Sequence, residues 1–406
     1  MTASLIVDDR LAKRNTVLLA FFQAISGSGT TVLYSSVALL VSGTMSVDKS
    51  LSTLPVSLLV VGTALGALPA GMLMRRYGRR NAFMFAGIMK ACCSLLLAYA
   101  ALVSDFLLLC LGVTGIGLLV AVSLQTRFAA AEGASEAFRP KAISYVMLGG
   151  VIAAILGPQT IIYTKDWFSP FVFVGAYLAQ AAYYLLGALV ISFLRLPQVK
   201  QEEAQVKEKG RSLGQIVQRG DYLIALACAA LSYSLMTLLM TSAPLAMVSC
   251  GFSESDAALG IQWHVLGMFV PSFFTGSLIS RFGTTRVIAA GFVLTGLAGV
   301  AGLTGIELTN FWGGLVLLGV GWNFSFIGST HLLTSTYSET EKSTAQSFND
   351  FIVFSCVGLT SFSSGKLFFT AGWETINLIV LPVVFTLLVL LVFLGVKRMT
   401  LSKKEG

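Results

Sequence analysis

The sequence predicts an all-α integral membrane protein, with twelve transmembrane helices arranged as two pseudo-symmetric bundles of six. Three observations predict that fold class: 55% of the 406 residues are hydrophobic, only 11% are charged, and the apolar residues fall in long runs. The mean hydropathy is +0.82. A soluble domain carries about 25% charged residues, because its core needs a polar surface. The exterior of this fold is therefore expected to face the lipid bilayer.

The apolar runs place the helices along the chain. A helix needs about 20 apolar residues to cross the hydrocarbon layer, and irregular backbone is not tolerated there. The first six predicted helices occupy residues 15–41, 53–74, 81–103, 106–126, 142–163 and 171–194. The second six occupy residues 221–247, 259–280, 287–305, 311–333, 345–369 and 375–396.

One long polar segment divides these helices into two sets. We expect an N-terminal six-helix bundle over residues 1–194, a cytoplasmic linker over 195–220, and a C-terminal six-helix bundle over 221–406. The first apolar run is too long for a signal peptide and lacks a small-residue cleavage site, so it is expected to remain as a helix.

The basic residues indicate the topology. When the loops are assigned alternately to two sides, most of the 27 Lys and Arg residues fall on the side of the termini and the central linker. By the positive-inside rule, both termini are cytoplasmic and the number of helices is even. The net charge of +8 is thus explained by orientation in the inner (cytoplasmic) membrane, and no nucleic-acid partner is expected.

A polar loop is repeated in the two halves. After the second predicted helix the chain reads Gly71-Met-Leu-Met-Arg75-Arg76-Tyr-Gly78-Arg79-Arg80. After the eighth it reads Gly276-Ser-Leu-Ile-Ser-Arg281-Phe-Gly283. Glycine, leucine, arginine, an aromatic residue and glycine recur in register. Repeated halves that meet at the bilayer midplane are a common design of transporters.

This loop resembles the signature of the major facilitator superfamily, Gly-x-Leu-x-Asp-Arg-x-Gly-Arg-Arg. The resemblance extends to the helix number and the central linker, and it implies two bundles around a cavity lined by helices one, four, seven and ten. In the family the acidic residue helps to latch the halves together. Here its place is taken by Arg75 and, in the second copy, by Ser280, so the expected latch loop lacks its usual acid.

Ionisable groups inside the membrane are functional candidates, because burying them is costly. Asp350 has three open interpretations: a replacement for the missing latch charge, a proton-coupling group, or a simple hydrogen-bonding residue. Gln346 lies one helical turn before it and shares its face. Lys90 is either a counter-charge for an anionic substrate or a lysine that snorkels or sits neutral against a helix partner. The candidate coupling or gating residues are thus Asp350, Gln346 and Lys90.

Polar and aromatic residues near mid-membrane are the candidate substrate-binding groups. A site that is mostly apolar with a few polar groups suits an organic solute. The absence of a deep carboxylate favours a neutral or anionic one. Each of these residues can equally join helices through hydrogen bonds. The candidates are Gln23, Tyr34, Gln159, Tyr233, Thr237, His264, Trp322 and Asn323.

We therefore expect a monomeric secondary transporter that moves a small organic solute by alternating access, coupled to protons. We expect no enzyme, cofactor or metal site, because neither the two histidines nor the six cysteines have ligand spacing. Gly150 and Gly157-Pro158 resemble part of an antiporter signature, so an efflux antiporter is one alternative. A non-transporting receptor and an intramembrane enzyme are the others; the solute and the direction of transport stay open.

Overall fold

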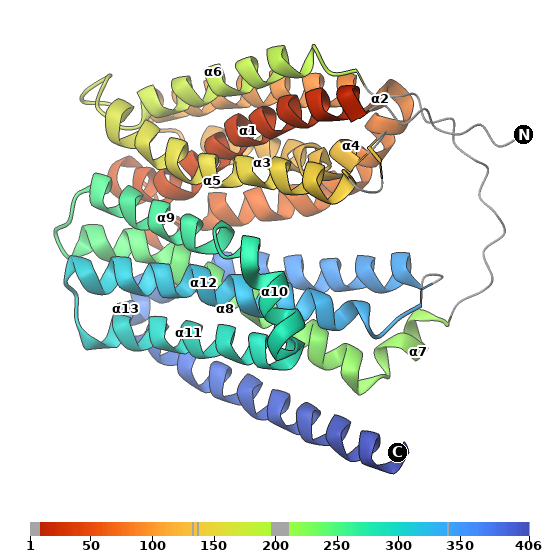
Figure 1. The fold of residues 1–406 in the computed structure, drawn as a ribbon. Coiled ribbons are helices and arrows are strands. Elements are labelled where there is room, and N and C mark those ends of the chain that lie inside the picture. Colours follow the sequence, from red (N-terminus) through yellow and green to blue (C-terminus); the bar gives the residue numbers. More distant parts are fainter. Residues whose placement is uncertain (1–8, 132–133, 136–137, 196–210, 339–340, 406) are drawn as a thin grey trace, which may run out of the picture. The chain divides into compact units, whose positions relative to one another are not determined.

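The structure is a computed structural model that describes residues 9–131, 134–135, 138–195, 211–338 and 341–405. Every regular element within these residues is helical, in agreement with the predicted class (Figure 1). The chain divides into two compact units. Unit 1 comprises Met1–Gln201 with Ser253–Gln262, and unit 2 comprises Glu202–Phe252 with Trp263–Gly406.

Unit 1 is a helical bundle in which α1 packs against α5 and α6, and α2 packs against α3 and α6. Buried Leu19, Phe22, Phe83 and Ile191 bring α1, α2 and α6 into one apolar core. The elements are α1 (Asp9–Thr44), the 3₁₀ turn η1 (Lys49–Leu51), α2 (Leu54–Val103), α3 (Phe106–Ser123), α4 (Thr126–Ala131), α5 (Arg139–Thr164) and α6 (Val174–Ile191).

The backbones of α2 and α3 approach closely because glycine faces glycine. A Cβ atom at Gly62 would lie 2.9 Å from the Thr114 carbonyl oxygen, and one at Gly117 would lie 2.5 Å from the Leu59 carbonyl oxygen. Small residues at helix interfaces allow such approach inside a membrane, where packing drives association. The glycines therefore act here as packing residues.

Three predicted helices of unit 1 differ from the prediction: two are joined and one is interrupted. The predicted helices 53–74 and 81–103 form the single element α2, which is broken only at Gly78. The predicted helix 106–126 instead ends as α3 at Ser123, and a short break separates it from α4. That break contains neither glycine nor proline, so the sequence pattern gave no sign of it.

Unit 2 is a second helical bundle, in which α8 packs against α12 and α13, and α11 packs against α12 and α13. α9 begins in unit 1 and continues in unit 2 from Trp263. The elements are α7 (Leu213–Val217), α8 (Gly220–Ser249), α9 (Glu254–Phe269), α10 (Ser272–Phe282), α11 (Thr284–Thr304), α12 (Leu308–Thr334) and α13 (Lys342–Glu405).

A carboxylate ties the chain before α8 to the loop after α12. Glu341 accepts hydrogen bonds from Arg211, from Nη2 to Oε2 at 2.7 Å and from Nε to Oε1 at 2.5 Å. The Ser338 backbone N–H donates to the same carboxylate at 2.9 Å. The Arg211 guanidinium, with help from Ser338, holds the pKa of Glu341 well below its usual range. The pair therefore anchors the end of the predicted linker that lies nearest to α8.

The apolar exterior and the helix lengths agree with a multi-pass membrane protein. On α3, Leu107 and Leu111 are 71% and 63% exposed, as expected of lipid-facing side chains. Ten described stretches are long and apolar enough to cross a membrane, or eleven if the bent pair α9 and α10 counts as one span. The 46-residue stretch Phe348–Phe393 is broken at Gly372 and is about twice the length that one crossing needs. Twelve crossings thus stay a prediction.

Candidate functional site

The repeated loop has the same backbone conformation in both copies. Gly78 has φ 78° and ψ 156°, and Gly283 has φ 86° and ψ 149°. This region is accessible almost only to glycine, which explains why glycine holds both positions. The Arg76 guanidinium lies 5.4 Å from the Tyr77 ring, and that of Arg281 lies 5.3 Å from the Phe282 ring. The sequence repeat is thus also a structural repeat.

The other residues of the first loop are exposed or partly buried. Arg75 and Arg80 are exposed, and a Cβ atom at Gly71 would meet no atom within 4 Å. Arg79 donates to the Gln125 carbonyl oxygen at 3.4 Å, next to the break between α3 and α4. Gly276 likewise has open space around it. The latch role of this loop stays a prediction.

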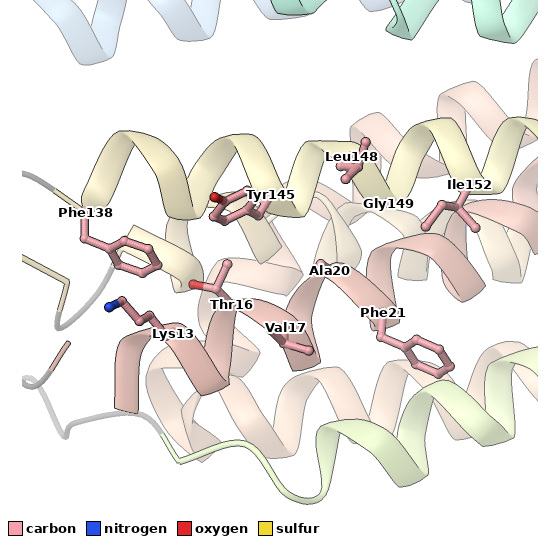
Figure 2. Close-up of a pocket in the computed structure, with 10 residues that line it drawn as sticks. All are labelled: Lys13, Thr16, Val17, Ala20, Phe21, Phe138, Tyr145, Leu148, Gly149 and Ile152. Carbon is pink, nitrogen blue, oxygen red and sulfur yellow. The ribbon is translucent and has the colours of Figure 1, made fainter. Parts of the chain in front are cut away.

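A largely apolar groove of about 530 Å³ lies between α1 and α5 of unit 1 (Figure 2). Figure 2 shows Lys13 and Phe138 at one end and Phe21 and Ile152 at the other. Lys13 Nζ lies 5.8 Å from the centre of the Phe138 ring. The volume falls in the range of small-molecule pockets, about 300–1,000 Å³. None of the residues predicted to bind substrate lines this groove, which is lined by Lys13, Thr16, Val17, Ala20, Phe21, Phe138, Tyr145, Leu148, Gly149 and Ile152.

Gly149 lets α5 approach α1 beneath the groove. A Cβ atom there would lie 2.5 Å from the Ala20 carbonyl oxygen and 2.9 Å from the Ala24 nitrogen. Larger side chains beside this contact remain open: Val17 is 69% exposed and Tyr145 is 52% exposed. The groove is therefore a shallow apolar surface with one cationic end.

An aromatic cluster joins α8, α12 and α13 in unit 2. The rings of Trp322 and Phe326 stack with centroids 5.0 Å apart and an interplanar angle of 11°. Tyr233 meets both rings edge-on, at 5.3 Å from each, and Phe354 lies 6.2 Å from Tyr233. Among the residues that the structure describes, the Trp322 indole N–H has no hydrogen-bond acceptor. The cluster thus combines flat apolar surface with one unused donor, and it contains two of the predicted substrate-binding residues.

Lys90 on α2 is completely buried in unit 1. Its amine donates to Ser26 Oγ on α1 at 2.6 Å and to Ser123 Oγ at the end of α3 at 2.8 Å. The Tyr184 ring of α6 lies 4.6 Å from the nitrogen, within cation–π distance. Four helices therefore meet at one amine.

Comparison with known proteins now decides the family. A sequence model described as Major Facilitator Superfamily matches residues 19–261 and residues 223–406. The riboflavin transporter RfnT of Brucella anthropi is 43% identical over 385 residues, which cover 95% of this chain and 96% of that protein. The chain belongs to the Major Facilitator Superfamily. It is a multi-pass membrane transporter of that type.

More distant relatives agree with this assignment. The uncharacterized MFS-type transporter YddS of Bacillus subtilis is 26% identical over 341 residues, 77% of each chain. A crystal structure of a mutant nucleoside transporter NupG matches 94% of this chain and 99% of its own, with a TM-score of 0.73 and 16% identity. The POT family transporter PepTSo matches 95% of this chain and 98% of its own, with a TM-score of 0.71 and 11% identity. At such identities the structures support the fold alone.

The predicted substrate-binding residue Asn323 is held by neighbouring polar groups in unit 2. Asn323 is completely buried, and its amide nitrogen donates to the Met268 carbonyl oxygen and to Ser272 Oγ, both at 2.6 Å. Its oxygen accepts a hydrogen bond from Thr275 Oγ1 at 2.5 Å. All three hydrogen bonds join Asn323 to residues at the bend between α9 and α10. A solute that hydrogen-bonds to Asn323 must therefore displace at least one of them.

His264 lies near the same bend and is also completely buried. Its Nδ1 lies 2.9 Å from the Leu315 carbonyl oxygen; because a carbonyl only accepts, Nδ1 carries the proton. Nε2 has no partner among the described residues. The ring therefore offers one unused acceptor inside unit 2.

The remaining predicted substrate-binding residues are spread over several helices. Gln23 Oε1 accepts from Thr126 Oγ1 at 2.9 Å, so α1 holds the start of α4. Gln159 Nε2 donates to Gln262 Oε1 at 2.9 Å, and both residues are assigned to unit 1. Tyr34 is half-buried on α1, and Thr237 is buried on α8. Their roles in substrate binding stay predictions.

The predicted coupling residues of α13 sit in a polar, open region of unit 2. Asp350 is exposed and accepts a hydrogen bond from Asn349 Nδ2 at 3.1 Å. Gln346 is half-buried, and its amide nitrogen donates to the Tyr337 hydroxyl at 2.6 Å. These contacts are compatible with each of the three interpretations of Asp350.

Sequence reasoning missed the groove between α1 and α5 and the partners of Lys90. Most residues that line the groove have ordinary apolar side chains, and only their exposure distinguishes them. A possible signal was the pair Gly149-Gly150 in the fifth predicted helix, which indicates close approach of a neighbour. In the part of the chain that the structure describes, no three His, Cys, Asp or Glu side chains gather as metal ligands.

Proposed function

We propose that this chain is a secondary transporter that carries riboflavin, or a closely related flavin, across the cytoplasmic membrane by alternating access. The observation that carries the proposal is the 43% identity to the riboflavin transporter RfnT over 95% of this chain. Riboflavin is a neutral molecule with a planar tricyclic ring and a polar ribityl chain. It therefore belongs to the neutral or anionic solutes that the sequence favours.

The proposal extends to coupling and topology. We infer that transport is driven by protons, that the chain crosses the membrane twelve times, and that both termini are cytoplasmic. The asymmetric distribution of Lys and Arg supports the orientation. The buried amine of Lys90 and the acid Asp350 are the groups that favour proton coupling.

The aromatic cluster of unit 2 is the surface that best suits a flavin ring. Trp322, Phe326 and Tyr233 are half-buried residues whose rings already pack on one another. Stacking of a base on an aromatic side chain is worth about 1–3 kcal/mol, and a flavin ring has a comparable flat face. The unused Trp322 N–H is buried in this structure, and it would have to become accessible to meet a ring carbonyl oxygen of the flavin. A buried donor without an acceptor costs about 1–3 kcal/mol, so this hydrogen bond would favour the bound state.

The test is riboflavin binding and uptake by the purified protein in proteoliposomes. The wild type should bind riboflavin saturably, with quenching of flavin fluorescence, and should exchange it across the membrane. Trp322→Phe keeps a ring but removes the N–H. Loss of one hydrogen bond of about 0.5–1.5 kcal/mol should weaken binding about two- to twelvefold.

Trp373→Phe is the matched control. Trp373 also has an indole N–H without an acceptor among the described residues, but it lines a separate cavity of about 10 Å³ in unit 2. Its substitution should leave riboflavin affinity unchanged. Folded wild-type protein that shows no saturable binding and no exchange of riboflavin would refute the proposed substrate.

A second candidate function is efflux of a small compound by antiport. It is favoured by Gly150 and Gly157-Pro158 in α5, which resemble part of an antiporter signature. Uptake into right-side-out vesicles compared with uptake into inside-out vesicles separates the two directions. Accumulation only in inside-out vesicles would favour efflux.

A further inference from the structure

The amine of Lys90 lies in an unusual environment for a charged group. The side chain is completely buried, and among the described residues its amine contacts two serine hydroxyls and the faces of two aromatic rings. Burying a charge costs several kcal/mol unless an opposite charge compensates it. Here hydroxyl oxygens and ring faces replace that opposite charge, since no salt bridge to Lys90 is formed by the described residues.

Each hydrogen of an ammonium group has a place in this cluster. One points to Ser26 Oγ at 2.6 Å and one to Ser123 Oγ at 2.8 Å. The third faces the Tyr184 ring, whose centre lies 4.6 Å from the nitrogen. The neutral amine is also accommodated, because either serine hydroxyl can turn and donate to its lone pair. The cluster can therefore hold both protonation states without rearranging the helices.

The titratable neighbours of the amine are few. From α6 the phenol Tyr184 faces it, and on α2 itself Cys93, nearly one turn along, interacts with that phenol. α1 contributes the neutral residues Ser26 and Phe22, and α3 contributes the neutral Ser123. None of these groups is a carboxylate. A proton that enters this cluster is therefore expected to reside on the amine.

The amine also lies beside the short break between helices α3 and α4. Ser123 is the last residue of α3, and α4 begins at Thr126. Lys90 holds the residue before the break, while Gln23 of α1 accepts the hydroxyl of Thr126 directly after it, at 2.9 Å. Ser26 Oγ and Ser123 Oγ lie 3.2 Å apart, so the two hydroxyls can also bond to each other. A change of charge at Lys90 thus acts directly on the link between α1 and the end of α3.

We propose that the Lys90 amine is the proton-binding site of unit 1 in the transport cycle, loaded as R–NH₃⁺ from one side of the membrane and returned to R–NH₂ by releasing H⁺ to the other. This inference rests on the proposed proton-coupled transport. A change of charge on the amine alters its hydrogen bonds to the hydroxyls of Ser26 and Ser123, and so affects the break between α3 and α4.

The transport experiment uses proteoliposomes with an imposed pH gradient of one unit. One proton per solute can drive about tenfold accumulation of riboflavin across such a gradient. Lys90→Met, which keeps length but cannot bind a proton, should abolish this accumulation while riboflavin counterflow without a gradient persists. Lys90→Arg, which keeps the charge permanently, should also lose accumulation. Lys366→Met is the control: this lysine of α13 is exposed, and its variant should accumulate riboflavin as the wild type does.

Two results overturn the proposal. The first is about tenfold accumulation of riboflavin by Lys90→Met in the pH gradient. The second is riboflavin accumulation by the wild type that does not depend on the pH gradient. Stability is controlled for, because the two serine hydroxyls can bond to each other once the amine is gone. Gel filtration and thermal unfolding of Lys90→Met should match the wild type.

A readout that needs no solute separates this proposal from the identity of the substrate. Lysine labelled with ¹³C at Cε gives one signal per lysine, and the signal missing from Lys90→Met is that of Lys90. We expect this signal to shift with pH within the range in which the protein stays folded. A signal that stays constant over that range would refute the proton site, whereas a shifting signal without riboflavin transport would refute only the substrate.

Discussion

Asn323 stabilises the bend between α9 and α10, and its substitution is the sharpest structural prediction. The two helices meet at an angle of 43°, at a break that contains Pro271. Proline has no N–H to donate, so backbone acceptors at the bend need other partners. Asn323 supplies two donors and one acceptor there, to Met268, Ser272 and Thr275, at distances of 2.5–2.6 Å. Asn323→Leu keeps the approximate volume and removes all three hydrogen bonds.

The expected cost follows from the number of bonds. Side-chain hydrogen bonds in membrane proteins contribute about 0.6 kcal/mol on average and about 1.7 kcal/mol at most. Three of them amount to about 2 kcal/mol, with an upper bound of about 5 kcal/mol. The free energy of unfolding of Asn323→Leu should fall by that amount, measured by titration of mixed micelles with dodecyl sulfate and followed by circular dichroism.

Asn310→Leu is the matched control for this measurement. Asn310 is half-buried, and its amide donates over 3.3 Å to Ala301 and to Thr304, distances at which hydrogen bonds are weak. Its substitution should cost less than about 1 kcal/mol. If Asn323→Leu resisted the detergent as well as Asn310→Leu does, the structural role assigned to the bend would be wrong.

Two further predictions concern stability. Glu341→Gln should lower the melting temperature at neutral pH, because it removes the ion pair with Arg211. The folded-state pKa of Glu341 is depressed, so the difference in melting temperature from wild type should be full above a pH of about 4.3 and should shrink as the pH falls below it. Thermal unfolding measured as a function of pH tests this. Gly62→Ala should destabilise the protein by about 1–3 kcal/mol, because its Cβ would meet the backbone of α3 at 2.9 Å. Gly71→Ala, with open space on the same helix α2, should be neutral or stabilising by up to about 1 kcal/mol, and equal effects of the two changes would refute the packing argument.

Local patterns were sufficient for the helices and for the repeated loop. Runs of apolar residues have about the length of a membrane crossing, so the helical class and the approximate positions of the helices follow from composition, whereas the number of crossings stays a prediction. Gly78 and Gly283 could be recognised because glycine is required by the backbone itself, and the same spacing to an arginine and an aromatic ring recurs. Signals of this kind are contained within about ten residues of sequence.

Contacts between distant residues could not be predicted in the same way. The partners of Lys90 lie 64 and 33 positions away, and serine is common in membrane helices, so no pattern singles out Ser26 or Ser123. The break after α3 follows Ser123 without glycine or proline, because tertiary contacts of Lys90 and Gln23 hold it in place. The function of these groups depends on convergence of four helices, which only the folded chain shows.

The two units handle an interrupted membrane helix in chemically different ways. Backbone groups at an interruption need hydrogen-bond partners, and transporters often place functional sites there. In unit 2 the bend is held by the amide of Asn323, which has no proton to gain or lose near neutral pH. In unit 1 the break is held by the amine of Lys90, whose charge can change. A substitution of Asn323 should therefore lower stability equally at all moderate pH values, whereas a substitution of Lys90 should alter how transport responds to pH. In the mechanism that we propose, this asymmetry assigns proton coupling to one of two similar halves.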